Sequence, residues 1–297
     1  MNQVAPGKPN GPQPMLQTQP GPPPPYFQGQ GMPMQVSTNQ SQVPGAVSAR
    51  GQVTWMPRPG GNCSIPGLEY LQQVDQILIM QSFELLEIFT NWECKNKYRI
   101  TNSMGQQVYF AQEESEVMQR QCCGPARGFT MHITDNMGQE VIRMVRPFKC
   151  CAGWQCCACC DGCSMDIAIE APPGQIVGYV AQECTCCDRR WSVMDAGKNK
   201  IFEIRGDCCV CQWICCPKDI PFDILTNDGS GKVGSLAKQW GGMAREMFTN
   251  ADNYCLSFPI DLDVKLKATL LGGAFLVDFM LFEGQNRQGY GGYGAYH

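Results

Sequence analysis

The chain has few of the residues that most hydrolases use. It has only two histidines, His132 and His297, among 297 residues, and no Gly-x-x-x-x-Gly-Lys-Ser/Thr loop. Without that loop there is no recognisable cradle for nucleotide phosphates. No nucleophile stands beside a base in a familiar pattern, and His132 falls in a predicted strand, where a structural role is more common. The sequence therefore argues against a nucleotide-driven machine and against an ordinary hydrolase.

Charge is also scarce. Charged residues make up 17% of the chain and the formal net charge is -4, which argues against nucleic acid as a bulk electrostatic partner. The N-terminus lacks the apolar run of a secretory signal peptide, so we expect a cytosolic chain, in which structural disulfides are rare. The 20 cysteines therefore need another explanation.

Residues 1–60 contain no Asp or Glu and are rich in Pro, Gly and Gln. Such a segment cannot bury enough apolar surface to offset its ordering entropy, so we predict a disordered tail. Within it Pro23, Pro24, Pro25 and Tyr26 fit the Pro-Pro-x-Tyr pattern that WW domains bind, and the proline run also suits SH3 domains. The alternative is a solvated spacer. Residues 285–297 are rich in Gly and Tyr and are predicted to be disordered as well.

A repeat organises the middle of the chain. Residues 100–108 recur as residues 133–141, and weaker copies begin at Ile167, Val193 and Ile224. Each copy is an apolar or alternating run, a turn sequence ending in Gly, and a second run, which predicts a β-hairpin. Residues 83–89 and 258–266 supply two further strands. About twelve antiparallel strands favour a closed β-barrel, which has no exposed edge.

Two segments have helical patterns. Leu236, Trp240, Met243 and Met247 form a stripe at helical spacing. Residues 268–282 are apolar on all sides, and Asp278 is their only charge. At ~1.5 Å per residue this helix is about 22 Å long, shorter than the ~30 Å hydrocarbon core of a bilayer. Length favours a helix that fills the barrel over one that spans a membrane. The positions that define it are Ala268, Leu271, Phe275, Asp278 and Phe282.

Most cysteines lie between hairpins and none lies at a hairpin tip, so we expect them on one rim of the barrel. Three interpretations compete. Cys160-x-x-Cys163 and Cys184-x-x-Cys187 have zinc-ribbon spacing, which makes Zn²⁺ a possible cofactor. Plain packing suits isolated thiols such as Cys63, Cys94 and Cys255. S-acylation suits clustered cytosolic cysteines near a membrane, and two or more acyl chains anchor stably.

Several segments carry a resemblance to the phospholipid scramblase family. They are residues 66–71, 75–78, 122–125, 135–141, 171–174, 251–253 and 258–264, within a matching region of about 64–284. The resemblance implies a tubby-like β-barrel around a C-terminal helix. It implies calcium-activated, ATP-independent, bidirectional movement of phospholipids between leaflets, without covalent chemistry.

The family's acylated cluster matches Cys156, Cys157, Cys159 and Cys160, with Gln155 in place of its first cysteine. Its calcium segment places ligands at Asn250, Asp252, Tyr254, Leu256, Phe258 and Asp261, and Asp263 is a nearby carboxylate. Asn250 stands where the family has Asp, and Cys255 where an EF-hand needs Gly, so we expect low affinity for Ca²⁺. The strict alternation of residues 258–264 is also typical of an ordinary strand. The family's nuclear-import segment matches residues 234–241, where Lys238 is the only charge.

Two classes of function remain. The first is a lipid-scrambling protein of the plasma membrane, on its cytosolic face or spanning once with a cytosolic N-terminus, as Lys265 and Lys267 would favour. It would have phospholipid membrane as its partner and a possible homo-oligomeric state. The second is an acyl-anchored adaptor that recruits WW or SH3 partners. A cytoplasmic or nuclear pool is expected when the chain is not acylated.

Overall fold

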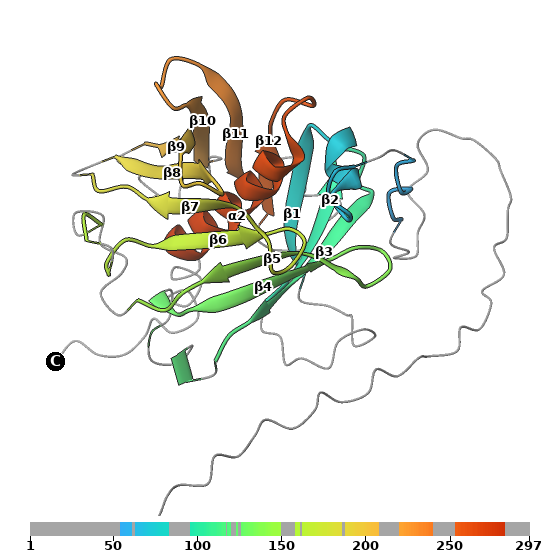
Figure 1. Cartoon of the computed structure of the whole chain (residues 1–297), viewed down its shortest axis with the longest axis horizontal. Coiled ribbons are helices and arrows are strands. Elements are labelled where there is room, and N and C mark those ends of the chain that lie inside the picture. Colours follow the sequence, from blue (N-terminus) through green and yellow to red (C-terminus); the bar gives the residue numbers. More distant parts are fainter. Residues whose placement is uncertain are drawn as a thin grey trace, which may run out of the picture. The chain divides into compact units, whose positions relative to one another are not determined.

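Twelve antiparallel strands form one closed barrel around a long helix, α2 (Figure 1). This computed structural model describes residues 54–60, 63–82, 96–116, 118–119, 123, 126–149, 158–160, 162–185, 188–207, 220–239 and 253–282. Each strand pairs with its neighbours in sequence, and β1 closes the barrel against β12. The predicted fold class is confirmed.

The elements follow one another in a simple order. A 3-10 helix, η1 (Glu69–Gln73), precedes the first strand. The strands are β1 (Gln76–Ser82), β2 (Lys97–Asn102), β3 (Gln107–Glu114), β4 (Phe129–Thr134), β5 (Glu140–Arg146), β6 (Asp166–Glu170), β7 (Ile176–Gln182), β8 (Arg189–Asp195), β9 (Lys200–Gly206), β10 (Ile220–Thr226), β11 (Lys232–Gln239) and β12 (Asn253–Ser257). Helix α2 (Val264–Leu281) is the last described element.

The strongest sequence repeat corresponds to two equivalent hairpin turns. The Asn102 side-chain oxygen accepts hydrogen bonds from the backbone N–H groups two and four residues later, at 3.0 and 2.9 Å. Asp135 does the same in the next hairpin, at 2.9 Å each. Gly105 and Gly138 follow with φ of 76° and 74°, which favours glycine. Both turns are therefore specified locally.

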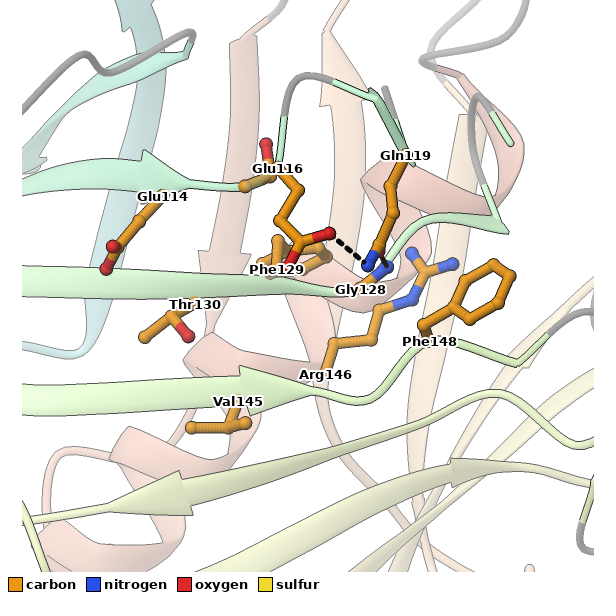
Figure 2. A pocket seen from close by; sticks show the side chains of 10 residues that line it. Glu114, Glu116, Gln119, Gly128, Phe129, Thr130, Val145, Arg146 and Phe148 are labelled. Carbon is orange, nitrogen blue, oxygen red and sulfur yellow. Dashed lines mark hydrogen bonds between the residues drawn. The ribbon is translucent and has the colours of Figure 1, made fainter. Parts of the chain in front are cut away.

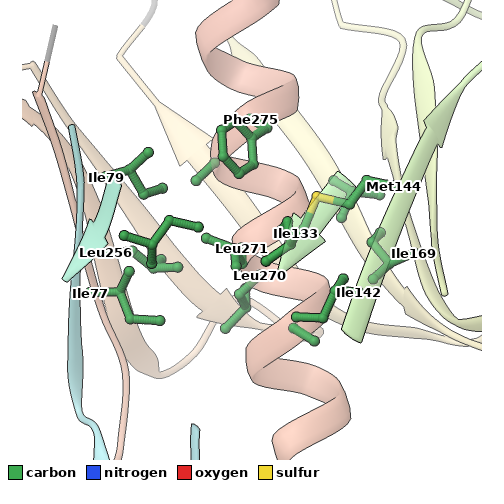
Figure 3. Packing of buried hydrophobic residues seen from close by; sticks show 14 of the residues in the cluster. Ile77, Ile79, Ile133, Ile142, Met144, Ile169, Leu256, Leu270, Leu271 and Phe275 are labelled. Atoms are coloured by element: carbon green, nitrogen blue, oxygen red, sulfur yellow. The ribbon is translucent and has the colours of Figure 1, made fainter. Parts of the chain in front are cut away.

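Helix α2 occupies the barrel interior. Its residues pack against β6, β7, β8, β12 and η1, and Ala268, Leu271, Phe275 and Phe282 are at most 1% exposed. Figure 3 shows Leu270, Leu271 and Phe275 facing isoleucines from strands on both sides of the helix. Gly272 lets the barrel wall approach the helix closely, because a Cβ at this position would lie 2.6 Å from Ile169 Cγ1. The helix is therefore the core of the fold.

The predicted strand at 258–266 is wrong, and the helix begins four residues earlier than predicted. β12 ends at Ser257, and Pro259, which has no N–H to give a ladder, starts a turn. The turn is closed by Leu262 N donating to Pro259 O at 3.2 Å. Asp263 then caps the helix by accepting from Lys265 N at 2.8 Å. The alternation of residues 258–264 is typical of a strand, but in the structure these residues form the turn and the helix cap.

Three other predictions, at residues 83–89, 236–247 and 54–60, differ from the structure or lie partly outside the described residues. The strand before the first hairpin is β1, at Gln76–Ser82, whereas the predicted run 83–89 lies outside the described residues. Leu236 belongs to β11, so the helical stripe is wrong there, and its other three positions are not described. Residues 54–60 were assigned to the tail, but Met56 is buried and its N–H donates to Gln107 O at 2.8 Å.

Candidate functional site

The topology separates two ends of the barrel. All five hairpin turns lie at one end because successive strands are antiparallel, and the segments that join one hairpin to the next lie at the other. We call the second end the connection rim and define it by the described residues of these segments, which are 115–116, 118–119, 123, 126–128, 147–149, 158–160, 162–165, 183–185, 188 and 207. The described cysteines of these segments are Cys123, Cys159, Cys160, Cys163 and Cys184. Cys156 and Cys157 lie outside the described residues.

Part of the predicted acylation cluster lies on an anchored turn. The Cys160 carbonyl accepts from Cys163 N at 2.9 Å and from Ser164 N at 3.0 Å. Lys149 ties the base of the segment together, because its ammonium donates to Ser164 O at 2.7 Å and to the Asp166 carboxylate. Cys159 and Cys160 are exposed, with sulfur atoms 4.0 Å apart. These thiols are therefore reachable for modification.

The structure separates the other cysteine roles. Cys63 packs against the core, as its packing interpretation expects, and Cys255 is half-buried with Gln76 Nε2 donating to its sulfur at 2.7 Å. Within the described residues no three His, Cys, Asp or Glu side chains gather closely enough to hold a metal ion. Cys187, the fourth thiol of the zinc spacing, is not described, so zinc stays a prediction.

The calcium positions do not form one compact loop. Tyr254 and Leu256 lie in β12, which pairs with β1 on one side and β11 on the other. Both side chains are buried. From Asn253 to Ser257 this strand extends about 13 Å at ~3.3 Å per residue, far longer than a Ca²⁺–ligand bond. Phe258 is buried as well, whereas Asp261 and Asp263 are exposed beyond the strand. Asn250 and Asp252 are not described.

Buried charges hold both ends of α2, and the sequence did not single out all of them. The Lys267 ammonium donates to the carbonyls of Leu71, Val74 and Ile260 at 2.8, 2.9 and 2.7 Å. Burial lowers the pKa of Lys267. At the other end Asp278 accepts hydrogen bonds from the hydroxyls of Tyr98 and Tyr254. A lone charge in an apolar run was the sequence signal for Asp278, whereas Lys267 lies just before that run and its carbonyl partners leave no sequence signal.

A second polar group lies beside the connection rim. The buried Arg127 guanidinium donates to Glu113 Oε1 from Nη2 at 2.7 Å and lies 5.0 Å from the Phe279 ring of α2. His132 bridges two carboxylates, with Nδ1 2.7 Å from Glu140 and Nε2 2.8 Å from Glu114. These contacts join β3, β4, β5 and the helix. They leave His132 in a structural role, as expected.

The described residues form a barrel filled by a helix, with an exposed cysteine turn on the connection rim. These features identify a class of barrel protein and do not identify an active site. Comparison with known proteins specifies the class further. A family profile described as Scramblase matches residues 56–284. The chain is 48% identical over 238 residues to phospholipid scramblase 1 of Homo sapiens, covering 80% of this chain and 72% of the relative. It is 46% identical over 253 residues to phospholipid scramblase 2 of Bos taurus, covering 84% and 83%.

The chain belongs to the scramblase family. The resemblance found in the sequence is thereby confirmed. No solved structure matches the chain. Among the described helices, none has both the length and the apolar character needed to cross a membrane.

Proposed function

We propose that this protein moves phospholipids between the two leaflets of a membrane, in both directions, with Ca²⁺ as activator and without ATP. The observation that carries the proposal is its identity of 46–48% to proteins named phospholipid scramblases, over most of the barrel. The lack of a nucleotide-binding loop supports ATP independence. Bidirectional movement down a gradient needs no covalent step, so no catalytic residue is assigned.

Acylation of the connection rim would place the barrel on the cytosolic face of the plasma membrane. The exposed turn at Cys159 and Cys160 supports this, and Cys156 and Cys157 immediately precede it. One acyl chain gives marginal binding, whereas two or more anchor stably. The rim would then face the bilayer, and a cytoplasmic or nuclear pool would form without acylation.

Calcium would act near the turn between β12 and α2. Asp261 and Asp263 are exposed there, and Asp75 is near enough to Lys267 to act on its charge together with Asp261. Few carboxylates on a turn give a weak site, at ~10⁻⁴–10⁻³ M. Asn250 and Asp252 precede the opposite end of β12, so one ion would not bind all the family positions in this conformation. Asp261→Ala should weaken calcium activation more than Asp252→Ala.

The filled interior shapes the route that lipids would take. Helix α2 leaves no space for a lipid inside the barrel, so phospholipids would cross along the outside of the protein, through bilayer that the anchored rim disturbs. An oligomer would disturb a larger area. The helix would stay inside the barrel throughout.

A second candidate function also has support. Because the barrel interior is filled, the chain could serve as an acyl-anchored adaptor, with Pro23, Pro24, Pro25 and Tyr26 as a ligand for WW or SH3 domains. Tyr26→Ala should abolish WW binding by a peptide of the tail. It should leave lipid movement unchanged if scrambling is the main function.

Vesicles that contain purified protein and a headgroup-labelled lipid test scrambling. A membrane-impermeant reductant bleaches only the outer-leaflet label unless lipids exchange. We expect bleaching to continue into the inner-leaflet pool when Ca²⁺ is present, and to stop at the outer pool in vesicles with heat-denatured protein. Bleaching that stops at the outer pool with native protein would favour the adaptor.

Cysteine variants test the anchor. Replacing Cys156, Cys157, Cys159 and Cys160 together with Ala should release the protein from cell membranes. Cys63→Ala is the matched control, because that thiol packs against the core rather than lying on the rim. If hydroxylamine, which cleaves thioesters, leaves membrane binding unchanged, acylation is not the anchor. Stoichiometric zinc in the purified protein would instead favour the metal interpretation.

A further inference from the structure

A pocket of about 400 Å³ opens at the connection rim (Figure 2). Its walls come from the end of β3, the segment after it, the start of β4, and the end of β5 with Phe148. The segment that continues from Phe148 carries the cysteine turn. The pocket therefore lies at the end of the barrel that acylation would bring to the membrane.

One wall of the pocket holds a buried cation. Arg146 is 2% exposed, and its guanidinium carbon lies 5.5 Å from the centre of the Phe129 ring. Its Nη2 lies 3.0 Å from Met165 Sδ, a weak acceptor. Figure 2 shows the guanidinium between Phe148 and the Gly128–Gln119 contact. A planar guanidinium suits a phosphate, which it can bind with two parallel hydrogen bonds.

Carboxylates line another part of the pocket. Glu114 and Glu116 are exposed, and the Glu114 side chain keeps 58% of its surface accessible while also contacting His132. Glu116 accepts from Gln119 Nε2 at 2.9 Å, and the Gln119 oxygen accepts from Gly128 N at 3.1 Å, which links these three residues at the pocket wall (Figure 2). The pocket thus presents both signs of charge, with the cation buried and the anions toward water.

An exposed aromatic side chain lies on the pocket wall. Phe148 is 44% exposed there. Large exposed apolar side chains beside a polar pocket are typical of a ligand that has an apolar part outside it. The entrance could therefore lie against acyl chains while the polar part of the ligand is held inside.

We propose that this pocket binds a phosphodiester that carries a cationic amine, as in the headgroups of phosphatidylethanolamine and phosphatidylcholine. Arg146 binds the phosphate, Glu114 and Glu116 attract the ammonium, and Phe148 contacts the start of the acyl chains. This assignment rests on the proposed function for its lipid source and adds a headgroup preference to it. Headgroups without a cation bind less well, because the carboxylates repel them.

Binding to the full-length purified protein is measured by calorimetry with short-chain lipids below their micelle concentration. Short-chain phosphatidylcholine is expected to bind roughly tenfold or more tightly than short-chain phosphatidylglycerol, which lacks the ammonium. Glycerophosphocholine has the same headgroup without acyl chains, and inorganic phosphate has only the anion. Glycerophosphocholine binding as tightly as the lipid would overturn the lipid source, and tight inorganic phosphate would overturn the amine requirement.

Variants test the individual contacts. Arg146→Lys keeps the charge but loses the paired hydrogen bonds, and is expected to weaken phosphatidylcholine binding roughly tenfold. Arg143→Lys, on the same strand but outside the pocket, is the matched control and should bind like wild type. Glu116→Lys is on the surface and should fold, and it should invert the preference toward phosphatidylglycerol. Unchanged preference in Glu116→Lys would overturn the proposal even if Arg146→Lys is unstable.

The two proposals fail in different ways. Vesicle scrambling that persists while neither Glu116→Lys nor Arg146→Lys alters lipid binding would reject the pocket and keep the scramblase. Specific phosphatidylcholine binding without vesicle scrambling would reject the scramblase and keep the pocket as a headgroup site.

Discussion

Lys267 shows how one buried charge can hold several elements in place. Its ammonium joins η1, the η1 C-cap residue Val74 and the turn before α2 through three carbonyl oxygens. We expect Lys267→Met to lower the free energy of unfolding by roughly 3 kcal/mol, because it leaves those carbonyls without their donor. Lys265→Met, two residues earlier and exposed, should change it by less than about 0.5 kcal/mol. Chemical denaturation measures both, and equal stabilities would contradict the structural role of Lys267.

The Glu140 carboxyl makes the stability of the fold depend on pH. Burial raises the pKa of its carboxyl, but hydrogen bonds from Arg143 and His132 outweigh this, and the folded pKa lies below its ordinary value of 4.5. A lowered carboxyl pKa stabilises the fold above the unfolded pKa, and that contribution disappears as pH falls through the folded value. Glu140→Gln should therefore reduce stability at neutral pH and flatten the loss of stability below pH 4.5. An acid limb as steep as that of wild type in thermal melts would contradict this.

At the scale of elements, the close contact between β7 and α2 allows a direct test of packing. A Cβ on Gly178 would lie 2.7 Å from Met194 O and 2.3 Å from Thr269 Oγ1, and the backbone oxygen cannot easily move. Gly178→Ala should cost about 1–3 kcal/mol. Gly162→Ala is the control, because nothing lies within 4 Å of its added methyl group. Equal melting temperatures for the two variants would show that the helix packs less closely.

The sequence predicted elements well where the determining contacts are local. Asn102 and Asp135 set their turns through bonds within four residues, so the hairpins were found. Strand β12 and the start of α2 were assigned wrongly because their boundary depends on Pro259 and the Asp263 cap, which a short alternating pattern obscured. Arg146 and Lys267 were missed as site and core residues, since their partners are distant in sequence or are backbone carbonyls.

At the scale of the molecule, the two ends of the barrel have different proposed roles. The connection rim has the exposed cysteines and the mixed-charge pocket, whereas the opposite end has the start of α2 and the carboxylates proposed for Ca²⁺. The helix connects them through a filled interior. Calcium would thus act at a distance from the membrane-facing rim, and the central claim is that lipids cross while α2 remains inside.

A disulfide between helix and wall tests that claim most directly. A Cβ on Gly272 would lie 2.6 Å from Ile169 Cγ1, so Ile169→Cys with Gly272→Cys places two thiols close enough to join once the isoleucine is gone. The bond is confirmed by mass spectrometry, and Ile169→Cys alone, treated with the same oxidant, is the control. The account predicts that vesicles with the oxidised double variant scramble phospholipids in Ca²⁺ as fast as the same protein after reduction. Scrambling that stops on oxidation and returns on reduction, with the control unaffected, would show that the helix must leave the barrel.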